Sequence, residues 1–213
     1  MSQSPLPPPL HEPLGVILGT RAKVDLLRVL AAQAAPLSQR ELARRAGVTL
    51  RSAQAALADL HAMGLAQKLV GGRDHLTQLN VHHVLAPTLT ALFSAESELA
   101  RNMRQSIATI ASGKQDPPLG LYLFGSVARA EETVESDVDI LLIGRDANHR
   151  DALLERTLAG VEDMQLRYGV TVAPIAYTIR EAKRGWVERA APWPELSRDV
   201  VSIKGPPLGE LLR

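Results

Sequence analysis

The chain contains no cysteine, which excludes disulfides, zinc–thiolate sites and thiol nucleophiles. Aromatic residues make up only 3% of the sequence, so a core has to be built mainly from Leu, Ala, Val and Ile. No run of about 18 apolar residues is present, and we therefore expect no membrane-spanning helix. The first residues lack a basic region followed by an apolar stretch, so we expect no secretion signal and a cytoplasmic protein.

The net charge is only +1, but the charges are unevenly distributed. Residues 15–85 contain nine Lys or Arg against four Asp or Glu, whereas acidic residues outnumber basic ones in the rest of the chain. This asymmetry predicts a basic domain and an acidic domain with different partners. Residues 1–14 are rich in proline, and we expect them to form a disordered tail.

The segment of residues 121–143 combines two apolar runs with small and acidic residues. The first run ends in Gly125 and Ser126, and the second follows Asp137 and includes Asp139. The pattern predicts a strand, a tight turn with a short helix, a loop and a second strand. Alternate residues of a strand share a face, so Asp137 and Asp139 should point the same way. Two converging carboxylates are costly unless a cation lies between them.

This combination suits nucleotidyl transfer from a nucleoside triphosphate (NTP). Mg²⁺, or Mn²⁺ in its place, binds carboxylate and phosphate oxygens, which Asp137 and Asp139 could share with a substrate. Gly125 has no Cβ and lets a phosphate approach the backbone closely. Ser126 offers a hydroxyl and an N–H at a helix start, and Arg129 could neutralise the triphosphate.

The segment resembles the glycine-serine and aspartate-x-aspartate signature of the DNA polymerase β-like nucleotidyltransferase superfamily, in particular its small bacterial "minimal nucleotidyltransferase" branch. The resemblance covers roughly residues 115–180. It implies Mg²⁺-dependent transfer of a nucleoside monophosphate to an acceptor hydroxyl on a small molecule, a protein side chain or an RNA end. For this branch, a toxin is one implied protein partner.

The chain departs from that superfamily at one position. Active members carry a third carboxylate on a later strand, and the matching strand here, residues 170–177, contains no Asp or Glu. By register we expect the missing carboxylate near Ala173. Pro174 predicts an edge position or a bulge, because proline cannot donate a ladder hydrogen bond. A transcriptional regulator whose nucleotidyltransferase-like domain is catalytically weak or inactive, and only binds a nucleotide or a partner, therefore stays open as an alternative.

The basic region predicts three helices, over residues 20–33, 38–46 and 50–63, followed by strands over 65–69 and 75–79. We expect Ser38 and Glu41 to form a capping box, and Thr49 to cap the third helix. A glycine-rich turn joins the two strands into a hairpin. This arrangement resembles the winged helix-turn-helix superfamily over about residues 18–82.

That resemblance implies that the third helix enters the major groove of double-stranded DNA. The side chains expected to reach base edges are Arg51, Ser52 and Gln54. Those expected to contact phosphates are Arg44, Arg45, Lys68 and Arg73. Two alternatives remain, a winged helix that binds proteins and a helix and hairpin that serve only packing.

We expect a long helix over residues 86–113 to connect the two domains, with a homodimer seam as the alternative because its apolar spacing is partly heptad-like. The region 114–213 predicts alternating strands and helices, including one helix over 150–168 and another over 180–190, with a mixed sheet. The whole chain is therefore predicted to be α+β, with an N-terminal winged helix, a connector helix and a C-terminal α/β nucleotidyltransferase domain.

Overall fold

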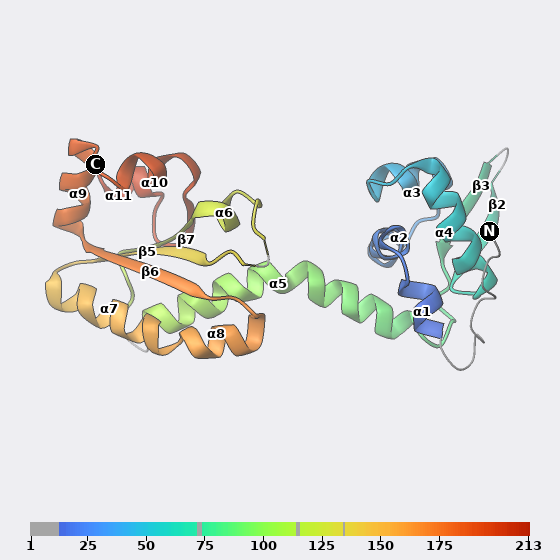
Figure 1. The fold of residues 1–213 in the computed structure, drawn as a ribbon, viewed down its shortest axis with the longest axis horizontal. Coiled ribbons are helices and arrows are strands. Elements are labelled where there is room, and N and C mark those ends of the chain that lie inside the picture. The colour runs from blue at the N-terminus through green and yellow to red at the C-terminus, as the bar shows by residue number, and fades with distance from the viewer. Residues whose placement is uncertain (1–12, 72–73, 114–115, 134) are drawn as a thin grey trace. The chain divides into compact units, whose positions relative to one another are not determined.

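The structure is a computed structural model that describes residues 13–71, 74–113, 116–133 and 135–213 (Figure 1). The chain divides into two compact units, Met1–Glu98 and Leu99–Arg213. Most of the expected proline-rich tail lies outside the described residues. Its last two residues begin helix α1, Pro13–Leu18, so helical structure starts before the boundary expected at residue 15.

Four helices form most of the N-terminal unit: α1, α2 (Arg21–Ala32), α3 (Gln39–Arg45) and α4 (Leu50–Ala62). The last three begin at side-chain caps, because the hydroxyls of Thr20, Ser38 and Thr49 each accept a backbone N–H of the first turn. These are the starts that the sequence predicts. The expected capping box at Ser38 is only half formed, since the Glu41 carboxylate turns to two arginines instead.

A small antiparallel sheet completes this unit. Strands β2 (Ala66–Gly71) and β3 (Asp74–Leu79) form the expected hairpin. The sequence analysis missed a third strand, β1 (Leu37–Ser38), which pairs with β3 and gives the order β1-β3-β2. Two residues are too few for a period-two pattern to appear in a sequence, which is why β1 escaped prediction.

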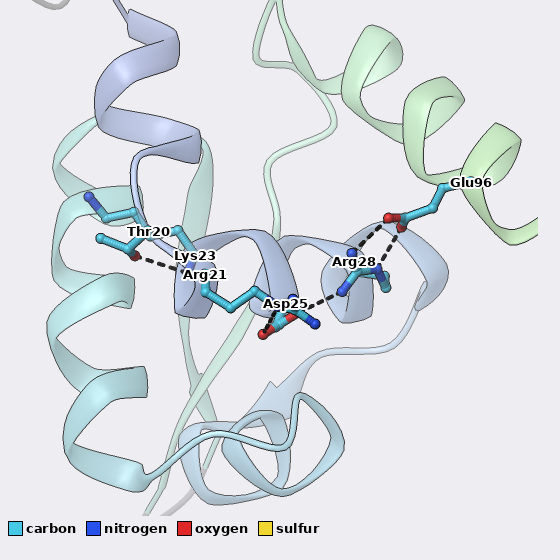
Figure 2. A network of polar contacts seen from close by, with 6 residues as sticks. All are labelled: Thr20, Arg21, Lys23, Asp25, Arg28 and Glu96. Carbon is cyan, nitrogen blue, oxygen red and sulfur yellow. Dashed lines mark hydrogen bonds and ion pairs between the residues drawn. The ribbon is translucent and has the colours of Figure 1, made fainter. Parts of the chain in front are cut away.

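Two sets of polar contacts accompany the leucine- and alanine-rich core of the N-terminal unit, one exposed and one buried. Arg28 donates to Asp25 at 2.6 Å and binds both oxygens of Glu96 at 2.6 and 2.8 Å (Figure 2). Lys23 is only 7% exposed, and its amine donates to the Val16 carbonyl at 2.8 Å and pairs with Asp59 at 2.7 Å. A buried ammonium group needs such partners, because burial without them is costly.

Helix α5, Ala86–Ser112, is the long helix that the sequence predicts. It is not a separate segment, because its residues contribute to two cores. Ala86, Leu89 and Phe93 pack in the N-terminal core. Met103, Ile107, Ala108 and Ala111 pack in a core of the C-terminal unit. The apolar side chains of Leu92 and Leu99 stay 54% and 52% exposed, and the homodimer seam remains a prediction.

The C-terminal unit contains a mixed four-stranded sheet of order β6-β5-β4-β7. Strand β5 (Val138–Gly144) runs antiparallel to β4 (Gly120–Phe124) and parallel to β6 (Val172–Thr178), and β7 (Val201–Lys204) pairs with β4. Pro174 lies on β6, an edge strand, as the sequence predicts. This mixed sheet confirms the expected α/β organisation.

Helices cover both faces of this sheet (Figure 1). The C-terminal part of α5 packs on one face with α7 (Ala147–Ala159) and α8 (Val161–Tyr168). The other face is covered by α9 (Ile179–Glu188), α10 (Trp193–Asp199) and α11 (Leu208–Leu211). The prediction of one helix over 150–168 is wrong, because the chain breaks at Gly160. A Cβ there would crowd Ile110 of α5, a tertiary contact that sequence spacing cannot show.

Candidate active site

The first element of the site is the turn after β4. The strand ends at Phe124, and Gly125 begins the single-turn helix α6, Gly125–Ala128. The φ of Gly125 is +76°, a left-handed conformation that favours glycine. A Cβ at this position would overlap Oδ2 of Asp139 on the neighbouring strand. Glycine is therefore favoured by its backbone angle, and a Cβ here would displace the Asp139 carboxylate.

The two aspartates lie at the start of β5, close to this turn. Asp139 pairs with Phe124 across the antiparallel ladder, and it belongs to the sheet face that α9, α10 and α11 cover. It is half-buried, whereas Asp137 just before the strand is exposed. Burial raises the pKa of Asp139, and the negative charge of Asp137 raises it further. The pair is therefore electrostatically unfavourable by itself, as the sequence analysis anticipates.

The strand pairing shows which residue of β6 lies beside Asp139. In the parallel pairing of β5 with β6, Asp139 lies directly opposite Ala173. This is the position at which the register argument places the missing group. Among the described residues, no group of three or more His, Asp or Glu could hold a metal ion together. The site thus presents two carboxylates and a methyl group where three carboxylates would stand in the superfamily that it resembles.

A cavity of about 610 Å³ opens over these residues. Its lining consists of Phe124, Gly125, Ser126, Arg129, Asp139, Arg198 and Asp199. The structure therefore brings together four of the five residues that the sequence analysis assigned to nucleotide and metal, and places Asp137 two residues away from Asp139 along the chain. A volume of this size fits a small-molecule ligand.

Arg129 already has carboxylate partners at the rim of the cavity. Its Nε donates to Glu131 at 2.8 Å, and its Nη1 donates to Asp199 at 3.3 Å. These contacts hold the guanidinium beside the cavity. A bound phosphate would compete with both carboxylates for it, so the arginine is positioned but not free.

Arg198 and Asp199 are the lining residues that sequence reasoning missed. Both come from the end of α10, far along the chain from the glycine-serine turn. No motif marks them, because an arginine and an aspartate near the end of a short helix are ordinary surface residues. Only the packing of α10 against the sheet brings them to the cavity.

The two aspartates have the chemistry that a divalent cation requires. No described residue donates a hydrogen bond to the side chain of Asp137 or Asp139, so their oxygens are available as ligands. Mg²⁺ is commonly held by one or two carboxylates together with substrate phosphates, and it keeps several waters. The residues present therefore fit such an ion, with Asp137 and Asp139 as its protein ligands.

Ala130 follows the turn and adopts a φ of +55°. This is a conformation that glycine favours. Alanine has a steric cost in this region, on the order of 1 kcal/mol, so the backbone is slightly strained at Ala130.

In the N-terminal unit, the residues expected to contact DNA lie on exposed parts of three elements. Arg44 and Arg45 lie on α3, where both pair with Glu41 at 2.6 Å, and these arginines lower the pKa of Glu41 to about 2. The exposed residues at the start of α4 are Arg51, Ser52 and Gln54, and Lys68 is exposed on β2. Arg73 lies outside the described residues.

Ser52 is less available than the sequence suggests. Its hydroxyl lies 2.9 Å from that of Thr49, and its backbone N–H donates to the same Thr49 oxygen. The serine therefore takes part in the cap of α4. The buried face of this helix, Ala53, Ala56, Leu57 and Leu60, packs in the core and leaves the opposite face exposed.

A family model described as a nucleotidyltransferase domain matches residues 105–191. This match supports a nucleotidyltransferase domain within the C-terminal unit. The matched segment includes the glycine-serine turn, both aspartates and the β6 strand with Ala173, and it supports nucleotidyl transfer as the general activity. No curated protein matches the chain. Of the helices that the structure describes, none combines the length and the apolar character needed to cross a bilayer.

Proposed function

We propose that this protein transfers a nucleoside monophosphate from an NTP to an acceptor hydroxyl, with Mg²⁺ or Mn²⁺ held by Asp137 and Asp139. The observation that carries the proposal is the glycine at +76° packed directly against the carboxylate of Asp139. That arrangement leaves the space above the turn open to a phosphate. The family match over the same residues supports it.

In the reaction, the acceptor oxygen forms a bond to the α-phosphorus, and the bond from that phosphorus to the bridging oxygen of pyrophosphate breaks. Pyrophosphate leaves, and the acceptor hydroxyl releases its proton to water, because Ala173 on β6 offers no base. A bound metal ion would activate the hydroxyl and offset the charge on the phosphates. Gly125 and Ser126 would contact the β- and γ-phosphates, and Arg129 would exchange a carboxylate partner for a phosphate oxygen.

Label transfer tests this proposal. The full chain is incubated with α-labelled ATP, GTP, CTP or UTP and Mg²⁺ or Mn²⁺, alone and with host lysate. We expect label in an acceptor, and its loss with EDTA or in Asp139→Asn. Asp163→Asn, which changes an exposed aspartate of α8, is the matched control and should keep activity. Label that persists in Asp139→Asn would contradict the proposed metal site.

The second candidate is a regulator in which the nucleotidyltransferase domain binds a nucleotide without transferring it. The alanine opposite Asp139 favours it, since no carboxylate on β6 can accept the proton of the acceptor. In the same assay, this candidate predicts no label in any acceptor. It also predicts Mg²⁺-dependent nucleotide binding that Asp139→Asn abolishes.

We also propose that the N-terminal unit is a winged helix-turn-helix that binds double-stranded DNA. Helices α2, α3 and α4 with the β2–β3 hairpin support this, as does the basic charge of residues 15–85. Arg44 and Arg45 are already paired with Glu41. Most of the contacts to DNA would therefore be made by Arg51, Gln54, Lys68 and Arg73. A protein partner, such as a toxin, is the alternative for the same surface.

DNA binding is measured by fluorescence anisotropy over a range of salt concentrations. Arg51→Ala should weaken binding, and the salt slope should fall by about one if its contact is to a phosphate. Arg21→Ala is the matched control, because Arg21 is exposed on α2 and already pairs with Asp25. Absence of binding to any duplex at low salt would leave the protein-binding alternative.

A further inference from the structure

A second cavity of about 350 Å³ lies between α9 and α10 in the C-terminal unit. Its lining consists of Trp186, Arg189, Trp193, Pro194 and Arg198. These include both tryptophans of the chain. Flat rings and guanidinium groups together form a lining of unusual composition for a protein with so few aromatic residues.

The indole of Trp193 is held in a fixed position. It is 3% exposed, and its ring lies 5.2 Å from that of Tyr177 at an angle of 53°. Gly185 of α9 packs against its Nε1, so closely that a Cβ there would overlap it. Trp186 is half-buried and packs against the same core. The aromatic wall is therefore rigid, which lowers the entropic cost of binding a ligand against it.

The two arginines that line the cavity, Arg189 and Arg198, make no ion pair with a described residue. Arg184 on α9, by contrast, pairs with Glu188 at 2.8 Å. Arg189 follows α9 in a left-handed conformation with φ +50°. Both guanidinium groups add positive charge to the described lining, and they favour an anionic ligand over a cationic one.

The tryptophan cavity and the cavity of the candidate active site share one lining residue, Arg198. Helix α10 runs from Trp193 at one cavity to Asp199 at the other. At 1.5 Å per residue these ends lie about 9 Å apart along its axis. A ligand of nucleotide size in the tryptophan cavity would thus be close to the reacting groups.

We propose that the cavity holds the acceptor, and that the acceptor is a nucleotide, either free or at the end of a single strand. This inference rests on the proposed transfer function. The half-buried indole of Trp186 offers a face on which a base can stack, with the buried Trp193 holding the wall in place, and arginines bind phosphates by paired hydrogen bonds. A cavity of this size suits one nucleotide. Base stacking tolerates every base, so recognition here would depend on the ring and the phosphate.

Intrinsic fluorescence tests the inference directly, since both tryptophans of the chain line the cavity. The full chain in EDTA is titrated with AMP and with five-nucleotide RNA and DNA strands. We expect saturable quenching. Arg189→Ala should weaken binding at least tenfold, and Arg184→Ala should leave it unchanged. Tighter binding of a strand than of AMP identifies a strand end, and equal binding identifies a free nucleotide.

Three results would overturn the inference. The first is the absence of quenching, and the second is equal binding by wild type and Arg189→Ala. The third is competition, in which a non-transferable NTP analogue with Mg²⁺ displaces AMP and strands alike, since the cavity would then hold the base of the NTP.

The transfer assay separates this inference from the proposed function. Label transfer with an acceptor KM unchanged in Arg189→Ala would refute the acceptor site alone. Quenching without transfer by any NTP would refute the function, leaving a nucleotide-binding cavity.

Discussion

Replacing Gly125 with alanine is expected to damage the active site in a way that can be separated from simple backbone strain. Two costs apply. A non-glycine residue in the left-handed region destabilises the fold by about 1–2 kcal/mol. Alanine also makes the unfolded chain less flexible than glycine does, which offsets about 0.5 kcal/mol of this cost. The new Cβ also overlaps the Asp139 carboxylate, and forcing an extra carbon into a packed position costs about 1–3 kcal/mol. The expected loss is about 2–4 kcal/mol.

Gly169 provides the matched control. Its φ is +69°, but a Cβ there would have no atom within 4 Å. Gly169→Ala should therefore carry only the backbone cost of about 1 kcal/mol. For a unit of this size, each kcal/mol lowers Tm by roughly 4 °C. We expect a fall of about 4 °C for Gly169→Ala and about 8–16 °C for Gly125→Ala.

Thermal unfolding followed by tryptophan fluorescence measures this difference, because both tryptophans lie in the C-terminal unit. Label transfer is measured on the same samples below their Tm. Gly125→Ala should lose transfer, since Asp139 is displaced, whereas Gly169→Ala should retain it. Equal Tm losses for the two variants, with transfer intact in both, would refute the packing argument.

Three further substitutions give distinct expectations. Ala173→Asp places a carboxylate opposite Asp139 and should raise the transfer rate at least tenfold, with Ala173→Asn as the control; an unchanged rate would show that β6 does not reach the acceptor. Glu41→Gln should tighten DNA binding and steepen its salt dependence, since it frees two arginines on α3; anisotropy showing weaker binding would contradict this. Lys23→Ala should destabilise the N-terminal unit by about 2–3 kcal/mol, measured by thermal melts in circular dichroism. Glu96→Gln, which removes an exposed ion pair, should cost only about 0.5 kcal/mol. A larger loss of stability for Glu96→Gln than for Lys23→Ala would be inconsistent with the burial of Lys23.

The sequence predicts most of what local chemistry determines. The hydroxyl caps of α2, α3 and α4 depend on one side chain and the next turn, so their starts are visible in sequence. The register that places Ala173 beside Asp139 follows from aligning two apolar strands, and the structure confirms it. The turn residue Gly125 is likewise marked by its place between an apolar run and a serine.

Features that depend on tertiary contact escape the sequence. The break at Gly160 reflects its closeness to Ile110, and the lining role of Arg198 and Asp199 reflects where α10 packs. Glu41 stands at capping-box spacing but prefers two arginines, whereas Thr178 and Glu181 form a complete capping box. In each case the local pattern permits several partners, and long-range packing or a stronger charge decides among them.

The sharing of α5 between two cores sets a limit on how the chain can be divided. No loop separates the units, because their border lies inside a helix. A fragment cut at residue 114 would discard Ile107 and Ala111 and leave the apolar face of the sheet beside them open to water. Even the matched segment from residue 105 omits Met103. A protease that cuts only in loops is therefore not expected to separate the two units at their border, since that border lies within α5.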